Sequence, residues 1–319
     1  MKDREPTNLE AEAWAFDERI NARVQQGFVP DLQRLEPNDY FYKSFWREPL
    51  YAKLYVGEMF SNYLQFFNGN LTKPSRILDI GCGPGYFSLE LARHGYDVVG
   101  VDISKDCIQV AEETLESADL GSDFGSLKYL CKSAHTLSDL GVFDGILSSG
   151  FLHHCEDLEL MASVFSSLLD ETGVLVLHEP PHKKFGINDA AFVTVVRQIL
   201  ALCDRWYDRP QDLKNEQQLL KAIEATHIEY VEERDPQEDG GQSPNDLAAD
   251  YDEISEALKT KFNLIEEKAS KCFTYRTIGG LRGKKENTAS IARFLDLVDQ
   301  TLVDNGLLNA NYLYSVWRN

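Results

Sequence analysis

From residue 76 onward, short apolar runs alternate with segments of helical periodicity. The apolar runs predict five strands, at residues 76–80, 97–102, 127–131, 143–148 and 173–178. Helical spacing of the apolar positions predicts helices in the gaps, at about 85–95, 104–118 and 157–170. Strands that alternate with helices in this way form right-handed crossovers and build a parallel sheet that is covered on both faces.

The rhythm lapses after Pro180 and returns near the end of the chain. Residues 181–262 are mostly helical and are expected to form an insertion. Within them, residues 232–256 hold ten acidic side chains against the single Arg234, which is typical of a solvated loop that enters a helix. The closing elements are two strands and one helix, at 264–276, 310–317 and 287–305. Together these elements predict an α/β fold with a doubly wound sheet.

Residues 1–74 precede this pattern and are expected to form a helical, aromatic-rich cap. Thr7 and Glu10 have the spacing of a capping box, which predicts the start of a first helix. Its apolar stripe is formed by Leu9, Trp14, Ile20 and Val24. A second helix, opened by Pro49, is expected to reach Phe67. Its inner side is expected to carry Leu50, Leu54, Leu64 and Phe67.

Composition and charge narrow the classes of function. The 319 residues are 43% hydrophobic and 26% charged, which is typical of a folded globular chain. Acidic residues outnumber basic ones by 52 to 32, and the formal net charge is −20. Because such a protein repels phosphate backbones and anionic membrane surfaces, we expect neither nucleic acid nor a membrane as a partner.

Cysteine usage and the N-terminus indicate the compartment. The six cysteines are at least 24 residues apart and form no Cys-x-x-Cys pair, so a zinc finger or a secreted disulfide framework is not indicated. The charged N-terminus lacks an apolar signal core, and no apolar run approaches the roughly 18 residues of a membrane span. We therefore expect a cytoplasmic protein.

The strongest chemical signal is the segment RILDIGCGPG at 76–85, in which a strand runs into three alternate glycines. Glycines let the backbone turn sharply and let a ligand lie against it, and the helix that follows presents unpaired amide groups. The next strand ends in Asp102, 21 residues after Gly81, where a nucleoside site places its ribose-binding carboxylate. A dinucleotide fingerprint needs glycine where this chain has Tyr86, so a nicotinamide or flavin site is the weaker alternative.

These residues resemble the class I S-adenosylmethionine-dependent methyltransferases. Residues 78–85 look like the first motif of that family, Val101-Asp102 like the acid after its second strand, and residues 143–154 like its fourth-strand segment. The resemblance is detailed over residues 76–180 and looser to the end of the chain. It implies a Rossmann-like, seven-stranded sheet whose last strand is antiparallel. It also implies S-adenosyl-L-methionine as the cofactor and S-adenosyl-L-homocysteine as the product.

The resemblance assigns cofactor roles to the matching positions. The methionine end and the ribose of the cofactor would lie beside the glycine loop. The adenine would lie after the third strand, where Ser133-Ala134 stands in place of the Asp-Ala pair that is frequent in the family. A hydroxyl or the backbone would then bind the adenine amino group. The implied cofactor-binding residues are Asp79, Gly81, Cys82, Gly83, Gly85, Asp102, Ile103, Ser133, Ala134 and Ser149.

Methyl transfer to a hydroxyl requires a positioned acceptor and a base, because the cofactor itself carries the activated group. Ligands of parallel sheets bind at the carboxyl ends of strands, so bases are expected after the fourth and fifth strands. The candidates are His153, His154, His178 and Glu179. Packing or capping is the alternative for the first two. His182 can be imagined in a metal cluster with His178 and Glu179, but no fourth ligand is indicated and no metal is expected.

Aromatic and basic clusters are the candidates for acceptor recognition. The rings at 40–46 either form a lid that excludes water and stacks on the acceptor, or form the core of the cap itself. The candidate lid residues are Tyr40, Tyr42, Phe45 and Trp46, with Phe41 between them. A basic cluster either binds an acceptor carboxylate or phosphate or forms a surface turn. It consists of Arg276, Arg282, Lys284 and Lys285.

These features predict one Rossmann-like methyltransferase domain, residues 75–319, preceded by a helical cap or lid, residues 1–74. The expected reaction transfers a methyl group from S-adenosylmethionine to a small-molecule acceptor, and oxygen is favoured because histidine and glutamate bases are available. Two alternatives stay open. One is a methyltransferase of protein or nucleic acid, and the other is a related fold that binds the cofactor as a cyclase or scaffold without transferring its methyl group.

Overall fold

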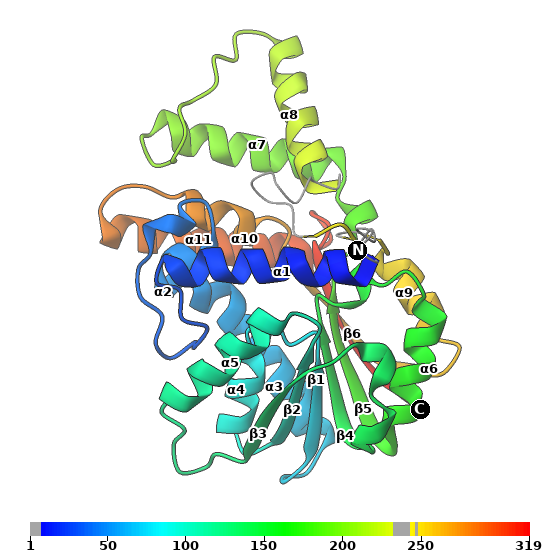
Figure 1. Cartoon of the computed structure of the whole chain (residues 1–319). Coiled ribbons are helices and arrows are strands. Elements are labelled where there is room, and N and C mark those ends of the chain that lie inside the picture. The colour runs from blue at the N-terminus through cyan, green and yellow to red at the C-terminus, as the bar shows by residue number, and fades with distance from the viewer. Residues whose placement is uncertain (1–7, 232–242, 246–247) are drawn as a thin grey trace, which may run out of the picture.

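A seven-stranded sheet forms the centre of the protein in a computed structural model that describes residues 8–231, 243–245 and 248–319. The strand order is β3-β2-β1-β4-β5-β7-β6 (Figure 1). The strands are β1 (Arg76–Ile80), β2 (Asp97–Asp102), β3 (Ser126–Cys131), β4 (Phe143–Ser149), β5 (Leu169–Glu179), β6 (Asn263–Ser270) and β7 (Tyr312–Arg318). Neighbours from β3 to β5 pair in parallel, whereas β7 runs antiparallel to β5 and β6. The predicted doubly wound sheet with an antiparallel last strand is confirmed.

Helices cover both faces of this sheet. They include α3 (Glu58–Asn70), α4 (Tyr86–Arg93), α5 (Lys105–Ser117), α6 (Leu158–Leu168) and α9 (Tyr251–Leu258). Alternate residues of a strand point to opposite faces, so each strand contributes to two apolar clusters. Ile77 and Val98 belong to the cluster that includes α3 and α4, whereas Leu78 and Val99 belong to the cluster that includes α6 and α9.

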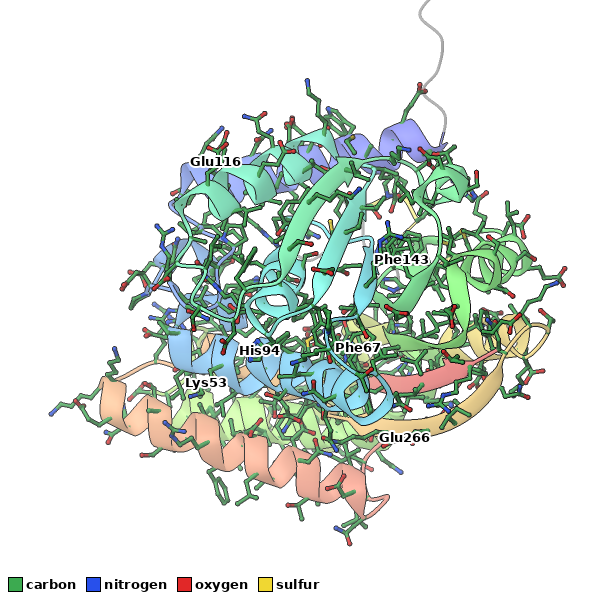
Figure 2. The ribbon with its side chains drawn as sticks, turned by 90° about the horizontal axis from the view of Figure 1, so that it is seen from below. Lys53, Phe67, His94, Glu116, Phe143 and Glu266 are labelled. Carbon is green, nitrogen blue, oxygen red and sulfur yellow. The ribbon has the colours of Figure 1, made fainter. Side chains whose placement is uncertain are left out.

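Large aromatic side chains fill the space between the sheet and its helices. Phe67 of α3 is fully buried and Phe143 of β4 is 1% exposed, and both lie inside the body in Figure 2. Charged side chains such as Lys53, Glu116 and Glu266 are exposed and point outward in the same view. Burying one phenylalanine stabilises a fold by roughly 1.5–3 kcal/mol, so these rings are a main source of the stability of the core.

Helix α1 (Asn8–Gln25) lies across the end of the sheet (Figure 1). Of its predicted apolar stripe, Leu9, Trp14 and Val24 are exposed and only Ile20 is buried. The prediction is wrong because the inward face of α1 borders a cavity that charged side chains also line, among them Glu12, which is 3% exposed. The position of Thr7, and with it the expected capping box, lies outside the described residues.

The second cap helix is interrupted by a π-helical turn. Helix α2 (Pro49–Ala52) passes through Lys53–Gly57 in π-helical geometry into α3. A π-helical turn adds a residue to the turn and rotates the face that follows. The buried side is therefore aromatic rather than leucine-rich: Tyr51, Tyr63 and Phe67 are buried. The predicted inner residues Leu50, Leu54 and Leu64 are only partly buried.

The segment after β5 is helical, as predicted. Helices α7 (Ile187–Leu202) and α8 (Glu216–Val231) pack against each other and project beyond α1 (Figure 1). Arg197 of α7 and Glu229 of α8 form a bidentate ion pair, with N–O distances of 2.6 and 3.1 Å. Part of the acidic run at 232–256 lies outside the described residues, and its last part forms α9, which Asp250 caps. In the described part of the chain, no helix is long and apolar enough to cross a membrane.

The predicted sixth strand ends six residues early, at Ser270. Asp299 of α11 (Lys285–Asp304) causes this, because its carboxylate accepts the backbone amides of Cys272 at 2.7 Å and Thr274 at 2.6 Å. The chain is thereby drawn away from the sheet and into α10 (Thr274–Thr277). The free-energy cost of burying a carboxylate is offset only by such hydrogen bonds, so this turn has a defined geometry.

Candidate active site

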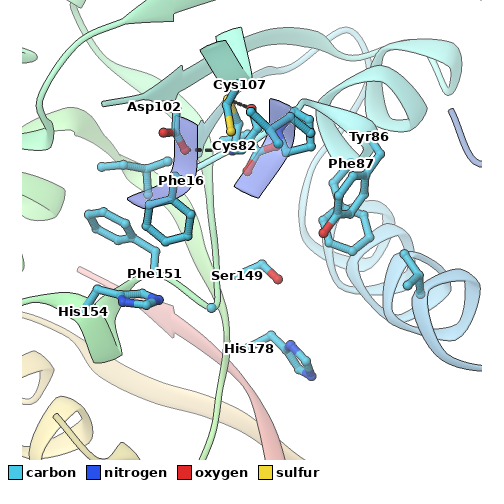
Figure 3. Close-up of a pocket in the computed structure, with 18 of the residues that line it drawn as sticks. Phe16, Cys82, Tyr86, Phe87, Asp102, Cys107, Ser149, Phe151, His154 and His178 are labelled. Carbon is cyan, nitrogen blue, oxygen red and sulfur yellow. Dashed lines mark hydrogen bonds between the residues drawn. The ribbon is translucent and has the colours of Figure 1, made fainter. Parts of the chain in front are cut away.

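A cavity of about 400 Å³ lies where the carboxyl ends of β1, β2, β4 and β5 meet α1. In Figure 3, Phe16, Phe151 and His154 lie on the same side of the cavity as Asp102, and Tyr86 lies on the opposite side. Most of the sequence-predicted site residues line this cavity. They are Phe45, Trp46, Asp79, Gly81, Cys82, Gly83, Asp102, Ile103, Ala134, Ser149, His153, His154 and His178. One cavity thus joins the glycine loop, the ribose-type carboxylate and three histidines.

The loop between β1 and α4 leaves space for a ligand against its backbone. Gly81 and Gly83 have φ angles of +69° and +52°, which only glycine adopts without strain. The amide of Gly81 donates to the carbonyl of Val101 at 2.9 Å and so ties the loop to β2. Apart from Gly83 and its two chain neighbours, no heavy atom of the described residues lies within 4 Å of the position that a Cβ would take on Gly83. A side chain at this position would fill the space that the loop leaves open.

Asp102 lies beside this open space with both carboxylate oxygens in use. Its Oδ2 accepts the amide of Gly83 and its Oδ1 accepts the amide of Ser104, both at 2.8 Å. Each oxygen has a second acceptor position, so both can also bind hydroxyl groups. Ser104 itself caps α5 by accepting the amide of Cys107 at 3.0 Å, which leaves Asp102 to the loop and the cavity. These residues fit the ribose of a nucleoside cofactor.

A second carboxylate, Asp79, lies in the same wall and is 2% exposed. Burial raises its pKa to about 7, although Ser88 donates a hydroxyl bond of 2.6 Å to it, and the charge of Asp102 raises the pKa further. Burial also raises the pKa of Asp102. Two carboxylates whose ionised forms are destabilised by burial favour a ligand that carries positive charge.

Helix α1 forms one wall of the cavity. The positions that line it recur every three or four residues and include Glu12, Phe16, Ile20 and Arg23. At its N-terminal end, Glu12 Oε1 lies 3.0 Å from Nδ1 of His154 and also accepts the hydroxyl of Ser243. Burial opposes ionisation of Glu12, but the bonds from His154 and Ser243 keep its pKa below the ordinary value. The charged contact fastens α1 to the loop that follows β4.

His153 and Glu179 form a buried pair between the ends of β4 and β5. Glu179 Oε2 lies 2.7 Å from Nδ1 of His153, and its Oε1 accepts the amides of Phe151 and Leu152 at 3.0 and 2.7 Å. When the imidazole is neutral and donates from Nδ1 to this carboxylate, its lone pair is on Nε2. Glu179 is fully buried and does not line the cavity, so it acts on His153 rather than on a ligand.

His178 has a different environment from His153. Its ring is stacked between Tyr312 and Tyr314, with centroid distances of 4.6 and 4.4 Å. Among the described residues, its buried Nε2 has no hydrogen-bond partner. Burial, and to a smaller extent repulsion from His153, lowers the pKa of His178 to about 3. The imidazole is therefore neutral near pH 7 and can form a hydrogen bond with a ligand. Its ring lies in the cavity wall on the same side as Ser149 (Figure 3).

Several predicted site residues do not line this cavity. Gly85 starts α4 and packs on Tyr129, whose hydroxyl donates to the Gly85 carbonyl at 2.9 Å. The Ser133 hydroxyl accepts the amide of His135 at 3.3 Å and so caps a short turn. The residues predicted for the site but absent from the lining are Tyr40, Tyr42, Gly85, Ser133 and Glu179. Tyr40 and Tyr42 are more than 40% exposed, because the loop turns them outward while Phe45 and Trp46 face the body.

The residues of the predicted basic cluster do not act together, and they lie outside the cavity lining. Arg276 lies 4.4 Å from the ring centroid of Tyr230 and donates to the carbonyl of Glu229 at 2.6 Å. Arg282 donates to the carbonyl of Tyr42 at 2.6 Å. None of Arg276, Arg282, Lys284 and Lys285 lines the cavity. Within the described ranges, no group of three or more histidine, cysteine, aspartate or glutamate residues is arranged to hold a metal ion.

An aromatic wall of the cavity has no counterpart in the sequence analysis. Tyr55 stacks on Tyr275 at 5.3 Å between centroids, and Tyr275 meets Tyr312 edge-on at 5.6 Å. These residues come from the cap, from α10 and from β7, so no local pattern connects them. Arg19 and Arg23 were missed as well, although their helical spacing with Glu12 is a signal that the sequence contains.

Comparisons with known proteins agree with this geometry. A family profile described as "Methyltransferase domain" matches residues 51–235, more than half of the chain. The chain is similar to a ubiquinone biosynthesis O-methyltransferase of Bartonella quintana (strain Toulouse), with 29% identity over 183 residues. That match covers 55% of this chain and 70% of the relative. A protein of the same name from Pelagibacter ubique (strain HTCC1062) is 34% identical over 105 residues, which are 33% of this chain and 42% of the relative.

A solved structure is similar over almost the whole length. The crystal structure of the cyclase SpnF has a TM-score of 0.53 and 13% identity, and the match covers 98% of this chain and 96% of that one. At this identity the likeness concerns the fold alone. The family profile, the order of the sheet and the glycine loop beside Asp102 lead to one conclusion. The chain belongs to the class I S-adenosylmethionine-dependent methyltransferase family.

Proposed function

We propose that this chain transfers the methyl group of S-adenosylmethionine to an oxygen atom of a small-molecule acceptor. The observation that carries the proposal is the buried His153–Glu179 pair, with Nδ1 and Oε2 2.7 Å apart, at the wall of the cavity that contains Asp102. The names of the curated relatives, which are O-methyltransferases, support the same reaction.

The residues that hold the cofactor in this proposal are those of the glycine loop and the two carboxylates. The cofactor supplies a methyl group activated on a sulfonium sulfur. Asp102 accepts the ribose hydroxyls, and the backbone beside Gly83 approaches the ligand without an intervening side chain. Asp79 contributes negative charge opposite the cationic part of the ligand. Ile103 and Ala134 form an apolar surface for the adenine ring.

The proton of the acceptor hydroxyl goes to Nε2 of His153. Glu179 keeps Nδ1 protonated and stabilises the imidazolium that forms, since its charge is held at 2.7 Å and is already bound by two backbone amides. His178 stays neutral and offers a hydrogen bond to the acceptor without taking its proton. These two histidines therefore have separate tasks in one cavity.

The aromatic wall positions the acceptor and keeps water away from it. Tyr55, Tyr275 and Tyr312 line the cavity together with Phe45. Such rings stack on flat, apolar molecules and exclude water from the reacting atoms. This composition favours a hydroxylated ring as the acceptor and does not resemble a groove for an extended peptide or a nucleic acid.

The test is transfer of a labelled methyl group to matched acceptors that offer an oxygen or a nitrogen, such as catechol and 1,2-diaminobenzene. We expect a methoxy product, and we expect His153→Gln to lower its rate by about 10²- to 10⁴-fold, the usual contribution of a general base. His135→Gln is the matched control, because this histidine is exposed and outside the cavity. A methylated nitrogen, or full activity of His153→Gln, would contradict the proposal. Binding of the cofactor without any transfer would favour the scaffold alternative.

A further inference from the structure

His182, three residues after the end of β5, carries polar atoms that the proposed reaction does not use. Both nitrogens of its ring are buried, and neither has a hydrogen-bond partner in the described part of the chain. A neutral imidazole has one N–H donor and one acceptor nitrogen, so both of its hydrogen bonds are left unmade. Buried polar groups are almost always paired, so two unpaired nitrogens on one ring indicate a partner that the chain itself does not supply.

A second unpaired polar atom lies in the same region. The hydroxyl of Tyr230, in the last turn of α8, is buried without a partner among the described residues, and the residue is only 1% exposed. Its ring stacks on that of Phe185, with centroids 4.1 Å apart, and Phe185 is three residues from His182. The end of α8 and the segment after β5 therefore pack together, and each contributes an unsatisfied polar side chain.

Arg276 of α10 adds a positive charge to these two side chains. Its Cζ lies 4.4 Å from the ring centroid of Tyr230, and its guanidinium donates to the backbone carbonyl of Glu229 at 2.6 Å. The carboxylate of Glu229 is engaged by Arg197, with N–O distances of 2.6 and 3.1 Å. Arg276 itself forms no ion pair with a carboxylate of the described residues. The two guanidinium groups therefore have one described carboxylate between them, and positive charge is in excess beside the unpaired hydroxyl.

The acidic-group cluster, formed by His182, Tyr230 and Arg276, borders the lining of the cavity. The ring of His182 meets that of His153 edge-on, with centroids 6.1 Å apart. Tyr275 lines the cavity, and its ring centroid lies 5.3 Å from Cζ of Arg276 and 6.4 Å from the ring centroid of Tyr230. The cluster is thus one side chain behind the wall that carries the proposed base. Side chains at a binding surface often change rotamer when a ligand binds, so a ligand in the cavity can reach it.

The hydrogen-bonding groups of the cluster define what it binds. Burial, and to a smaller extent repulsion from His153 and Arg276, lowers the pKa of His182 to about 3, so its ring is neutral near pH 7 and donates one hydrogen bond. The hydroxyl of Tyr230 is a further donor, and a guanidinium offers several. Convergent donors around one fixed positive charge match an oxygen group that carries negative charge, because hydrogen bonds to a charged acceptor are the stronger ones.

We propose that the acceptor carries an anionic oxygen group, such as a carboxylate, that binds among His182, Tyr230 and Arg276. This inference rests on the proposed function, because the hydroxyl to be methylated lies at His153 in the same complex. The two imidazole centroids are 6.1 Å apart, which is about the span of one substituted ring. The acceptor class is therefore a small hydroxylated aromatic acid.

The test is calorimetric titration of the full chain, saturated with S-adenosylhomocysteine, with 3,4-dihydroxybenzoate and with 3,4-dihydroxybenzamide. These two ligands have nearly the same shape and differ in charge. We expect wild type to bind the benzoate about tenfold or more tightly than the amide. Arg276→Gln should weaken the benzoate by about tenfold to a hundredfold, as expected for charged hydrogen bonds, and should change the affinity for the amide by less than about twofold.

Tyr230→Phe is the milder variant, because it removes only the unpaired hydroxyl and keeps the ring that stacks on Phe185. It should weaken the benzoate by about threefold to tenfold. The matched controls are Arg209→Gln and Tyr207→Phe, since both residues are exposed and outside the cavity lining. Both controls should bind the two ligands like wild type. Affinity for S-adenosylhomocysteine, measured for every variant, should stay within about twofold of wild type and reports that the fold is intact.

Four results overturn the proposal. Wild type shows no preference for the benzoate, Arg276→Gln and Tyr230→Phe both keep the preference, the controls lose it equally, or the variants weaken S-adenosylhomocysteine instead of the benzoate. The second result would mean that buried water satisfies the unpaired atoms, and the fourth that the anionic group belongs to the cofactor. The titrations need no methyl transfer, whereas the proposed function fails if the methyl group is found on nitrogen or if His153→Gln is fully active. The two proposals therefore fail separately.

Discussion

Glu179 holds the imidazole of His153 from the neighbouring strand, with Oε2 and Nδ1 2.7 Å apart. The other oxygen of the same carboxylate accepts the amides of Phe151 and Leu152. One fully buried side chain thus fixes the loop after β4 and the orientation of the ring that the loop carries. The carboxylate is a positioning group, and its removal affects both the loop after β4 and the orientation of the His153 ring.

Replacement of this carboxylate should slow catalysis without weakening cofactor binding. Glu179→Gln keeps the shape but offers one acceptor oxygen and no charge, so an imidazolium at His153 loses its counterion. We expect kcat to fall by about tenfold to a hundredfold. Affinity for S-adenosylhomocysteine should remain within about twofold, and the pH dependence of kcat should change. The exposed Glu224→Gln is the control. Unchanged kcat and pH dependence in Glu179→Gln would argue against the pair.

Asp102 provides the clearest test of the cofactor site. Asp102→Asn removes the charge and one acceptor from a side chain that receives the amides of Gly83 and Ser104. We expect affinity for S-adenosylhomocysteine to fall by about tenfold to a hundredfold, measured by calorimetry. Asp97→Asn, at the opposite end of the same strand, is the control, because its carboxylate binds Ser126 outside the cavity. If Asp102→Asn and Asp97→Asn bound S-adenosylhomocysteine equally well, Asp102 would not be part of the cofactor site.

The cap rings should differ in their effect on the acceptor. Phe45 lines the cavity, and its ring centroid lies 4.7 Å from that of Tyr55. Tyr42, in contrast, is 42% exposed and does not line the cavity. Phe45→Leu should raise the KM for the acceptor by about fivefold through lost ring contact, with cofactor affinity unchanged. Tyr42→Leu should leave both quantities unchanged. If the two variants behave alike in steady-state kinetics, the ring of Phe45 has no part in acceptor binding.

Buried neutral histidines should make the fold sensitive to acid. Burial lowers the pKa of His182, like that of His178, to about 3, whereas an unfolded histidine titrates near 6.5. As the pH falls below 6.5, the unfolded chain gains protons that the folded chain does not bind, so stability is lost progressively down to about pH 3. Between pH 6.5 and 5 this amounts to about 2 kcal/mol for one such histidine.

His182→Asn should therefore reduce the acid-induced loss in the free energy of unfolding by about 2 kcal/mol over this interval. Urea unfolding at pH 6.5 and 5 measures it. The exposed His135→Asn should retain the loss of the wild type. If wild type and His182→Asn lost the same free energy of unfolding between pH 6.5 and 5, His182 would be protonated in the folded protein.

The contact between Glu12 and His154 should control how fast ligands leave. Glu12→Gln removes the charge that fastens α1 to the loop after β4, where the two side chains are 3.0 Å apart. We expect S-adenosylhomocysteine to dissociate about three to ten times faster, as measured by stopped-flow displacement. Glu18→Gln, on the exposed face of the same helix, should dissociate like the wild type. Equal rates in all three proteins would mean that α1 does not gate the cavity.

The central fold was predictable because its signals are local. Strands β1 and β2 begin and end at the predicted residues, since each is an apolar run bounded by turn residues. Strand β6 was predicted too long, because the side chain that ends it, Asp299 of α11, lies 29 residues beyond Ser270 in the sequence. A boundary set by a distant side chain leaves no trace in the local pattern.

The glycine loop of the site was predictable from the sequence, whereas the cavity wall formed by α1 was not. Gly83 and Asp102 have a fixed spacing that follows from the geometry of a strand, a turn and a helix. In α1, apolar residues were expected to face inward, yet Trp14 is 62% exposed and Glu12 is buried. Apolar patterning identifies the inner face of a helix only where that face meets the core, and here it meets a space meant for a charged molecule.

Helix α1 also links the two ends of the cavity mechanically. Glu12 and Arg23 both line the cavity and stand eleven positions apart, which is about 16 Å along one rigid helix. A ligand that orders the helix at one end reduces the conformational entropy that a second ligand has to remove at the other. Cofactor and acceptor should therefore bind with positive cooperativity even without touching each other. By thermodynamic reciprocity, each tightens the other by the same factor.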